Sequence, residues 1–200
     1  MNTTANITTT ANPIVIDKSR MIKRIAIILG SAVAIFILLF AISAFLAMKV
    51  WNGLDAGQPA PSFSGHDLNG NPLRLEDYQG KPVMLTFWSP DCGACREELP
   101  TLQAIASDPN ADITLLTIVS KVPAAEVQQF VTEAGLTFPI LVDEPGNIAK
   151  AYEITGVPVS YFINPDGKID HSIIGAGSED TLRNDLFTWL GTCNLEEVCR

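Results

Sequence analysis

The chain has 200 residues, 47% of them hydrophobic, and a formal net charge of −9. This length suits one domain of ordinary size with an appendage and is too short for two full domains. Residues 51–200 hold 8 Lys and Arg against 21 Asp and Glu, a formal charge of −13, which argues against nucleic-acid binding because such binding depends on cationic contacts to phosphate. The acidic balance indicates a solvated surface or, alternatively, attraction of basic partners.

The longest apolar run is IAIILGSAVAIFILLFAISAFLAM, from Ile25 to Met48, with no charge in 24 residues. As a helix it would rise about 36 Å, enough to cross a hydrocarbon core of about 30 Å. A cleaved signal peptide is the alternative, but its apolar region is normally about 7–15 residues long and ends in a small-residue cleavage site, which SAFLAM matches poorly. We therefore expect a retained transmembrane anchor over residues 25–48.

Positive charges flank this run unevenly, since only Lys49 closely follows it, whereas four precede it: Lys18, Arg20, Lys23 and Arg24. The more positive flank tends to stay in the cytoplasm. Residues 1–24 are therefore predicted to be a cytoplasmic tail, and its Thr- and Asn-rich start is typical of disorder. The bulk of the chain is expected outside the cytoplasm.

Residues 49–60 contain Gly and Pro without apolar periodicity, which predicts a linker. One domain is expected over residues 61–191, followed by a tail over 192–200 that holds Cys193 and Cys199. The domain opens with two short strand candidates within Phe63–Leu75, separated by the turn cluster DLNGNP.

Apolar runs typical of buried strands then alternate with amphipathic helices. Strands are predicted at Val83–Trp88, Ile113–Val119, Phe138–Val142, Val159–Ile163 and Ile169–Ile174, the last two joined by the hairpin turn NPDG. Helices are predicted at Ala94–Ala106, Ala124–Gly135 and Gly146–Tyr152, and from Ser178 onward. This alternation predicts an α/β domain with a central sheet.

The segment SPDCGAC places Cys92 and Cys95 between a buried strand and a helix. A zinc site would need two more soft ligands nearby, and an inert disulfide here would close a ring too small to constrain much chain. At a helix start, unpaired N–H groups and the helix dipole favour a thiolate. We therefore expect Cys92 to be a nucleophile and Cys95, one turn further on and less exposed, to be the resolving thiol.

Three segments resemble the thioredoxin superfamily, and within it the membrane-anchored TlpA/ResA/CcmG(DsbE)-like thiol-disulfide oxidoreductases. They are TFWSPDCGACREELP at 86–100, FPILVDEPGNIAKAY at 138–152 and TGVPVSYFINPDGKI at 155–169. With the opening hairpin, the resemblance covers about residues 58–191. It implies a thioredoxin-like fold: a central mixed β-sheet flanked by helices, an N-terminal β-hairpin and a central αβ insertion over Glu126–Tyr152, all preceded by one transmembrane helix.

The resemblance also implies a substrate-binding surface. Trp88 matches the family's active-site tryptophan, although a simple aromatic of the core is the alternative. Val157 and Pro158 match the loop with a cis-proline that lies against the dithiol and binds an incoming peptide. An ordinary trans turn is the alternative for Pro158.

The position of one acidic residue distinguishes the TlpA/ResA-like subfamily from thioredoxin itself. Thioredoxin has a buried aspartate six positions before the nucleophile, where this chain has Thr86. TlpA/ResA-like proteins instead have a glutamate three positions after the second cysteine, which is Glu98 here. Such a carboxylate can take or return the proton of Cys95. The alternative is a solvated acid like its neighbour Glu97.

Two features depart from the family pattern. The dipeptide Gly93-Ala94 between the cysteines lacks the proline common in the superfamily. Asp91 stands where many relatives have tryptophan, and its negative charge should oppose a thiolate at Cys92 unless it is a mere surface acid.

The remaining cysteines, Cys193 and Cys199, lie beyond the family core. In an oxidising compartment a structural disulfide between them is the plain interpretation, and a dithiol that relays electrons is the alternative. The two histidines, His66 and His171, are not at metal-ligand spacing from a cysteine, so no metal or other cofactor is expected. A peroxiredoxin would have threonine and proline where this chain has Ser89 and Leu85.

We therefore expect a single-pass protein of the bacterial inner membrane with a periplasmic catalytic domain, a thiol-disulfide oxidoreductase acting through Cys92 and Cys95. The resemblance implies that it reduces protein disulfides, including those of apocytochrome c in cytochrome c maturation, with electrons from a transmembrane thiol carrier of the CcdA/DsbD type. A disulfide oxidase or isomerase of the same fold and a non-enzymatic metal-binding module or copper chaperone remain alternatives.

Overall fold

The computed structural model describes residues 18–51, 53–109 and 111–195. The expected disordered tail and Cys199 lie outside these residues, and the side chain of Cys193 is likewise not among those described. The chain divides into two compact units between Ala47 and Met48.

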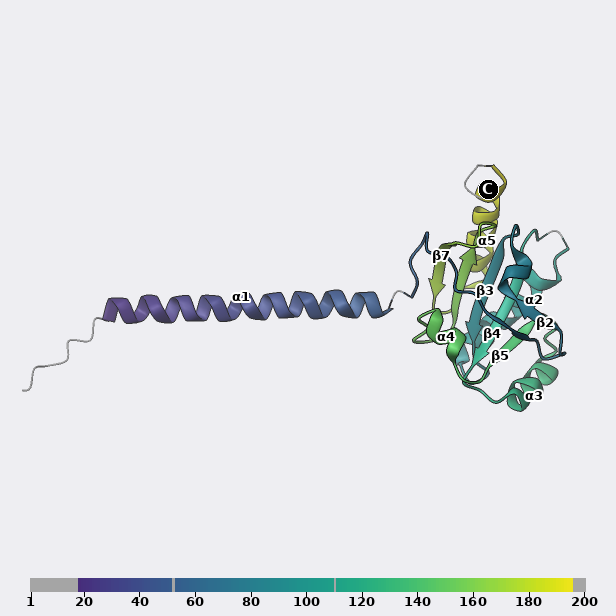
Figure 1. Ribbon diagram of the computed structural model, residues 1–200, viewed down its shortest axis with the longest axis horizontal. Coiled ribbons are helices and arrows are strands. Elements are labelled where there is room, and N and C mark those ends of the chain that lie inside the picture. The colour runs from purple at the N-terminus through teal and green to yellow at the C-terminus, as the bar shows by residue number, and fades with distance from the viewer. Residues whose placement is uncertain (1–17, 52, 110, 196–200) are drawn as a thin grey trace, which may run out of the picture. The chain divides into compact units, whose positions relative to one another are not determined.

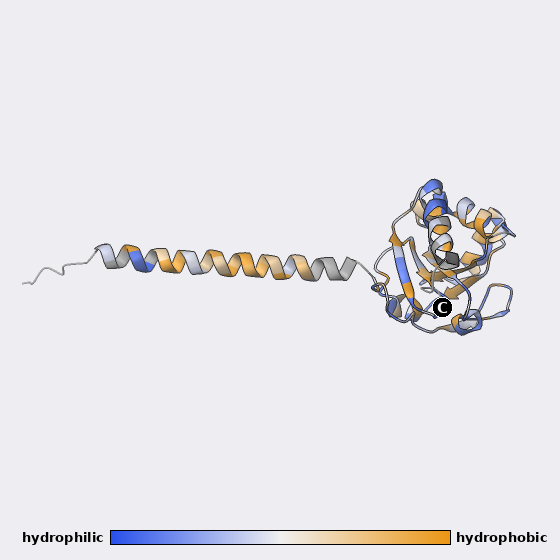
Figure 2. Cartoon of the chain, turned by 90° about the horizontal axis from the view of Figure 1, so that it is seen from above, coloured by the Kyte–Doolittle hydropathy of each residue, from blue (hydrophilic) through white to orange (hydrophobic). Residues whose placement is uncertain are grey.

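The first unit is built on one long helix, α1 (Lys18–Trp51). Within it, Ile22–Phe45 is long and apolar enough to cross a membrane, judged by length and composition. Figure 2 shows this stretch as mostly hydrophobic. Its large side chains are exposed, Phe36 to 70%, and so many apolar groups in water would be unfavourable. The helix is therefore a candidate membrane span, as the sequence predicts.

The second unit contains a five-stranded mixed sheet in the order β5-β4-β3-β6-β7 (Figure 1). Its strands are β3 (Val83–Trp88), β4 (Thr114–Ser120), β5 (Ile140–Asp143), β6 (Val159–Ile163) and β7 (Ile169–Ile174). The first three run parallel, whereas β6 is antiparallel to β3 and β7 to β6. The predicted hairpin is β1 (Ser64–His66) with β2 (Pro72–Arg74), followed by the short helix η1 (Leu75–Tyr78). The predicted fold class is confirmed.

Four helices surround the sheet: α2 (Gly93–Ser107), α3 (Ala124–Ala134), α4 (Asn147–Ala151) and α5 (Glu179–Leu195). Local chemistry sets their ends. Gly135 ends α3 because its left-handed backbone, φ 66°, suits glycine. The Ser178 hydroxyl accepts the N–H of Thr181 in the first turn of α5. Helix α2 continues past Pro100, whose ring nitrogen has no proton to donate to the preceding turn.

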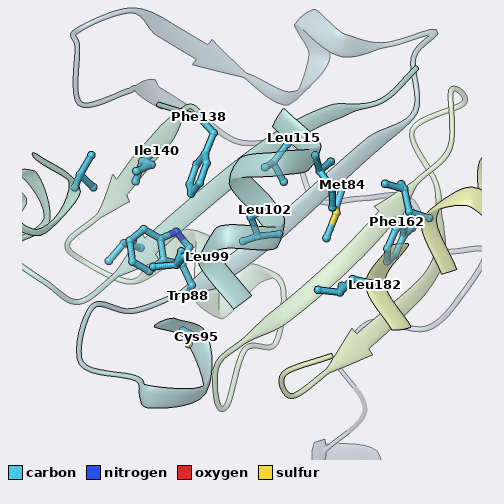
Figure 3. Close-up of a cluster of buried hydrophobic side chains, with 14 of the residues drawn as sticks. Met84, Trp88, Cys95, Leu99, Leu102, Leu115, Phe138, Ile140, Phe162 and Leu182 are labelled. Atoms are coloured by element: carbon cyan, nitrogen blue, oxygen red, sulfur yellow. The ribbon is translucent and has the colours of Figure 1, made fainter. Parts of the chain in front are cut away.

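The sheet separates two apolar clusters, because successive side chains of a strand point to opposite faces. Met84 and Trp88 of β3 pack with α2, α3 and α5 on one face (Figure 3). Leu85 and Phe87 pack toward the hairpin and α4 on the other. All six residues of β3 are buried, so the end of this strand, from which the dithiol segment departs, is fixed by packing on both faces.

The predicted linker is partly docked on the domain, which differs from the expected start at residue 61. Gly57 N–H donates to Ile169 C=O at 2.7 Å, and Ile169 N–H donates to Gln58 C=O at 2.9 Å. Leu54 N–H also donates to the hydroxyl of Tyr161 at 3.2 Å. The physical reason is that β7 is an outer strand whose backbone groups need partners, so residues 54–60 belong to the folded domain.

Asp143, at the end of β5, holds the start of α4 through hydrogen bonds. Its buried carboxylate accepts the N–H groups of Asn147, Ile148 and Ala149, which start α4, and the hydroxyl of Ser120. Asp143→Ala should lower the free energy of unfolding by about 3 kcal/mol, because buried donors lose their acceptor. Urea unfolding of the detergent-solubilised chain measures this. Asp166→Ala, at an exposed turn, is the control and should change little; equal losses in both would contradict the assignment.

Candidate active site

Cys92 and Cys95 form a disulfide at the start of α2, with their Cα atoms 5.2 Å apart. The turn Ser89–Cys92, closed by Cys92 N–H donating to Ser89 C=O, brings the chain from β3 into the helix. Cys95 is only 1% exposed and belongs to the core cluster in Figure 3, whereas Cys92 is half-buried. An external thiol or disulfide can therefore reach Cys92 more readily than Cys95.

Opposing groups surround the Cys92 sulfur. As the residue that caps α2, Cys92 accepts the N–H of Cys95 at 3.1 Å, and the helix N-terminus adds a partial positive charge, so both favour a thiolate in the reduced protein. The carbonyl oxygen of Val157 lies 3.5 Å from the same sulfur and would favour the protonated thiol. Asp91, exposed beside it, adds a negative charge. The stabilisation of a thiolate is therefore only partial.

The Val157–Pro158 peptide bond is cis, as the resemblance implies. Pro158 is buried at the start of β6, and its carbonyl accepts the N–H of Gly175 at 2.9 Å. Val157 is half-buried and packs against both apolar clusters. The loop is thus held from two sides, with the Val157 carbonyl next to the dithiol.

Trp88 is part of the core. It is 1% exposed, its ring centroid lies 5.8 Å from that of Phe130 on α3, and Figure 3 shows it beside Leu99 of α2. Its buried Nε1 has no hydrogen-bond partner among the described residues. This geometry matches the alternative interpretation, an aromatic of the core, because the side chain offers no surface to a substrate.

Glu98 lies one helical turn after Cys95 and is 3% exposed, unlike its exposed neighbour Glu97. Its buried Oε2 atom has no hydrogen-bond partner among the described residues. Burial raises the pKa of this carboxyl to about 7, because a charge in an apolar environment is poorly solvated. Glu98 is therefore a buried acid that changes protonation near neutral pH, and the solvated alternative is wrong.

The position of the thioredoxin aspartate is occupied by a neutral pair. The hydroxyls of Thr86 and Ser160, on paired strands β3 and β6, lie 2.8 Å apart and are buried. The buried acids of the described domain are Glu98 and Asp143. The Asp143 carboxylate accepts the N–H groups at the start of α4. Glu98 alone combines burial with a place on the dithiol helix.

Sequence reasoning did not single out Arg96, the residue after Cys95. Its Nε–H donates to the carbonyl of Pro90, and its guanidinium lies 5.4 Å from the ring centroid of Phe130. It therefore ties the loop before Cys92 to helix α3 of the insertion. The only signal in the sequence was its place four residues after Cys92, one turn along the helix.

His171 is part of the packing on the outer strand of the sheet. The His171 ring stacks on Phe162 at 4.2 Å between centroids, and its Nδ1 is 2.9 Å from a carboxylate oxygen of Asp170. Among the described residues, no three His, Cys, Asp or Glu side chains are grouped so that they could hold a metal ion.

Comparison with known proteins adds to this geometry. The sequence pattern of the AhpC/TSA family matches residues 56–172. The thiol-disulfide oxidoreductase ResA of Geobacillus kaustophilus is 29% identical over 170 residues, which cover 84% of this chain and 95% of that protein. The ResA protein of Geobacillus thermodenitrificans is 31% identical over 131 residues, covering 65% and 75%.

Comparison with solved structures gives the same result as comparison with sequences. A putative thiol:disulfide interchange protein DsbE from Chlorobium tepidum has a TM-score of 0.64 at 25% identity, covering 69% of this chain and 99% of that one. A secreted Mycobacterium tuberculosis disulfide oxidoreductase homologous to DsbE has a TM-score of 0.57 at 30% identity, covering 63% and 95%. With the match spanning more than half of the sequence, the chain belongs to the AhpC/TSA family of thioredoxin-like proteins and is a thiol-disulfide oxidoreductase of the ResA/DsbE type.

Proposed function

We propose that the chain is a membrane-anchored reductant of protein disulfides that works outside the cytoplasm through Cys92 and Cys95. The observation that carries this proposal is the asymmetry of the dithiol: a half-buried Cys92 caps the helix, and a buried Cys95 lies one turn from the buried acid Glu98. These are the positions that attack, resolution and proton transfer require.

The reaction proceeds in two exchanges. The Cys92 thiolate attacks one sulfur of the substrate disulfide, forms a mixed disulfide and releases the other sulfur as a thiolate. Cys95 then loses its proton and attacks the Cys92 sulfur, which restores the Cys92–Cys95 disulfide and releases the second substrate thiol. Two electrons pass to the substrate, and its two sulfurs take up two protons. A membrane thiol carrier of the CcdA/DsbD type would return the electrons.

Glu98 is the proposed proton acceptor for Cys95. Both lie on the buried side of α2 three residues apart, a spacing that makes side chains neighbours on a helix. A carboxyl with a pKa of about 7 is charged in about half of the molecules at neutral pH, so it can accept the Cys95 proton in one half-cycle and return it in the other. The oxidised pair needs no charge nearby, which is consistent with the buried, unpartnered carboxyl.

The groups around Cys92 support the reducing direction. Strong oxidants of this fold stabilise the reduced form by a greatly favoured thiolate. Here the Val157 carbonyl and Asp91 oppose that thiolate, so the reduced form is less stable and gives up its electrons more readily. Helix α1 and its positive N-terminal flank support an inner-membrane anchor with the domain in the periplasm. The resemblance supports apocytochrome c as a substrate.

The redox potential tests the direction. We expect a value near the −270 mV typical of thioredoxin, well below the −120 mV typical of a strong oxidant. Equilibration of the detergent-solubilised chain with glutathione or dithiothreitol, followed by alkylation of free thiols, measures it. A potential near −120 mV would show that the chain is an oxidase instead.

Trapping tests the roles of the two cysteines. Cys95→Ser should accumulate mixed disulfides through Cys92 in the native membrane, because the second exchange cannot occur, and mass spectrometry would identify the captured protein. Cys92→Ser is the matched control: it should capture nothing and lose insulin reduction by at least a hundredfold, since only the buried sulfur is left. Full reductase activity in Cys92→Ser would overturn the assignment of the nucleophile.

The pH dependence tests Glu98. Resolution of the mixed disulfide should become faster as pH rises through about 7, since only the deprotonated carboxylate accepts a proton. Glu98→Gln should slow this step about a hundredfold at neutral pH and remove the inflection near 7. Stopped-flow tryptophan fluorescence can follow it. Glu97→Gln, at the exposed neighbouring position, should keep both rate and profile; the same loss there would rule out a role specific to Glu98.

A further inference from the structure

The sheet edge beside the dithiol has unpaired backbone groups. Strand β7 is the outer strand, and Ile174 lies opposite Val159 of β6. Because Gly175 N–H donates to Pro158 C=O, Val159 and Ile174 form a non-hydrogen-bonded pair of the antiparallel ladder. The N–H and C=O groups of Ile174, and of Ser172 two residues earlier, therefore point away from β6. None of the described backbone groups pairs with them.

The other end of the same edge already holds an extended chain. Residues 57–60 of the docked linker bond to Ile169 and Gly167 in antiparallel fashion. Their hydrogen bonds do not reach Ser172 or Ile174 at the other end of β7, although Gly53 of the same segment lines the cavity beside Ile174. The edge is thus shaped to accept an added strand, and half of it is free.

An apolar cavity adjoins the uncovered end. Ile174 is 43% exposed, and it is the one large hydrophobic side chain of the described domain that is so exposed, since the others lie between Ile22 and Phe45 of α1. With Ile154 and Val159 it lines a cavity of about 200 Å³, and Glu153 contributes a negative charge to the wall. The cavity has room for a branched aliphatic side chain and favours a cation at its rim.

This cavity adjoins the loop that contacts the dithiol. Thr155 and Gly156 line it, and the next residue, Val157, places its carbonyl oxygen 3.5 Å from the Cys92 sulfur. Strands β3, β6 and β7 are neighbours spaced about 4.8 Å apart, so about 10 Å separates the end of β3 from the end of β7. An extended peptide covers that distance in about three residues.

We propose that the Ser172–Ile174 edge and the adjoining cavity bind the extended segment that flanks the reacting cysteine of a substrate protein, with an aliphatic side chain in the cavity about three residues from that cysteine. This inference rests on the proposed reduction of protein disulfides. Because residues 51–200 carry a formal charge of −13, a basic segment is favoured, with Lys or Arg alternating with aliphatic residues.

The test compares two probes on the full-length, reduced chain in detergent. One is a synthetic disulfide-bonded peptide with alternating valine and lysine in five-residue flanks. The other is the small aromatic disulfide 5,5′-dithiobis(2-nitrobenzoate), which has no flanks. Ile174→Asn, which removes the apolar surface without adding a charge, should lower the second-order rate constant for the peptide at least tenfold and leave that for the small disulfide within twofold. Ile174→Val should preserve both rates.

The control Ala106→Asn introduces the same polar side chain at an exposed position near the far end of α2 and should change neither rate. Equal slowing of both probes by Ile174→Asn would overturn the docking proposal, as would no slowing of the peptide. A concentration-dependent dimer that Ile174→Asn abolishes, with unchanged peptide rates, would assign the edge to a second copy instead. If the unmodified chain reduces neither probe, the proposed function itself fails and the docking proposal with it.

Discussion

The structure depends on one junction, where the central strand β3 ends at Trp88 and helix α2 begins five residues later at Gly93. All of β3 is buried between two apolar clusters, so the position of Trp88 is fixed from both faces. Cys92 therefore caps α2 at a defined place at the sheet's edge, and the N–H of Cys95 points at its sulfur. Because the helix is anchored by its buried side, Cys92 is held as the more exposed sulfur and Cys95 as the buried one.

The environment of the dithiol is a balance of small electrostatic effects. The helix N-terminus and one N–H group favour the Cys92 thiolate, while the Val157 carbonyl and Asp91 oppose it. Deeper in the fold, burial keeps Glu98 protonated up to about neutral pH. The site thus combines a partly stabilised thiolate with an internal acid.

The outer strand β7 contacts a segment that the sequence alone predicts to be a separate linker. Its first half binds residues of the segment that follows the membrane-span candidate, and Tyr161 accepts the N–H of Leu54. The Tyr161 hydroxyl in turn donates to the Tyr152 carbonyl, just before the cis-proline loop. Residues 54–60 are thus tied into the same region of the sheet that supports the cis-proline loop.

Local sequence patterns were enough to predict several strands and the position of the dithiol. The bounds of β3, β6 and β7 follow from apolar runs and the NPDG turn, because strand length and hairpin chemistry are written in neighbouring residues. The cysteine pair and its place at a helix start could also be predicted from the sequence. The burial of Glu98, the removal of Trp88 from the surface, the contact of Arg96 with Pro90 and Phe130, and the docking of residues 54–60 were decided only by tertiary packing. Apart from the bond of Arg96 to Pro90, these features depend on groups far apart in sequence. The solvation of a side chain is a property of the surfaces that meet around it rather than of its neighbours in the chain.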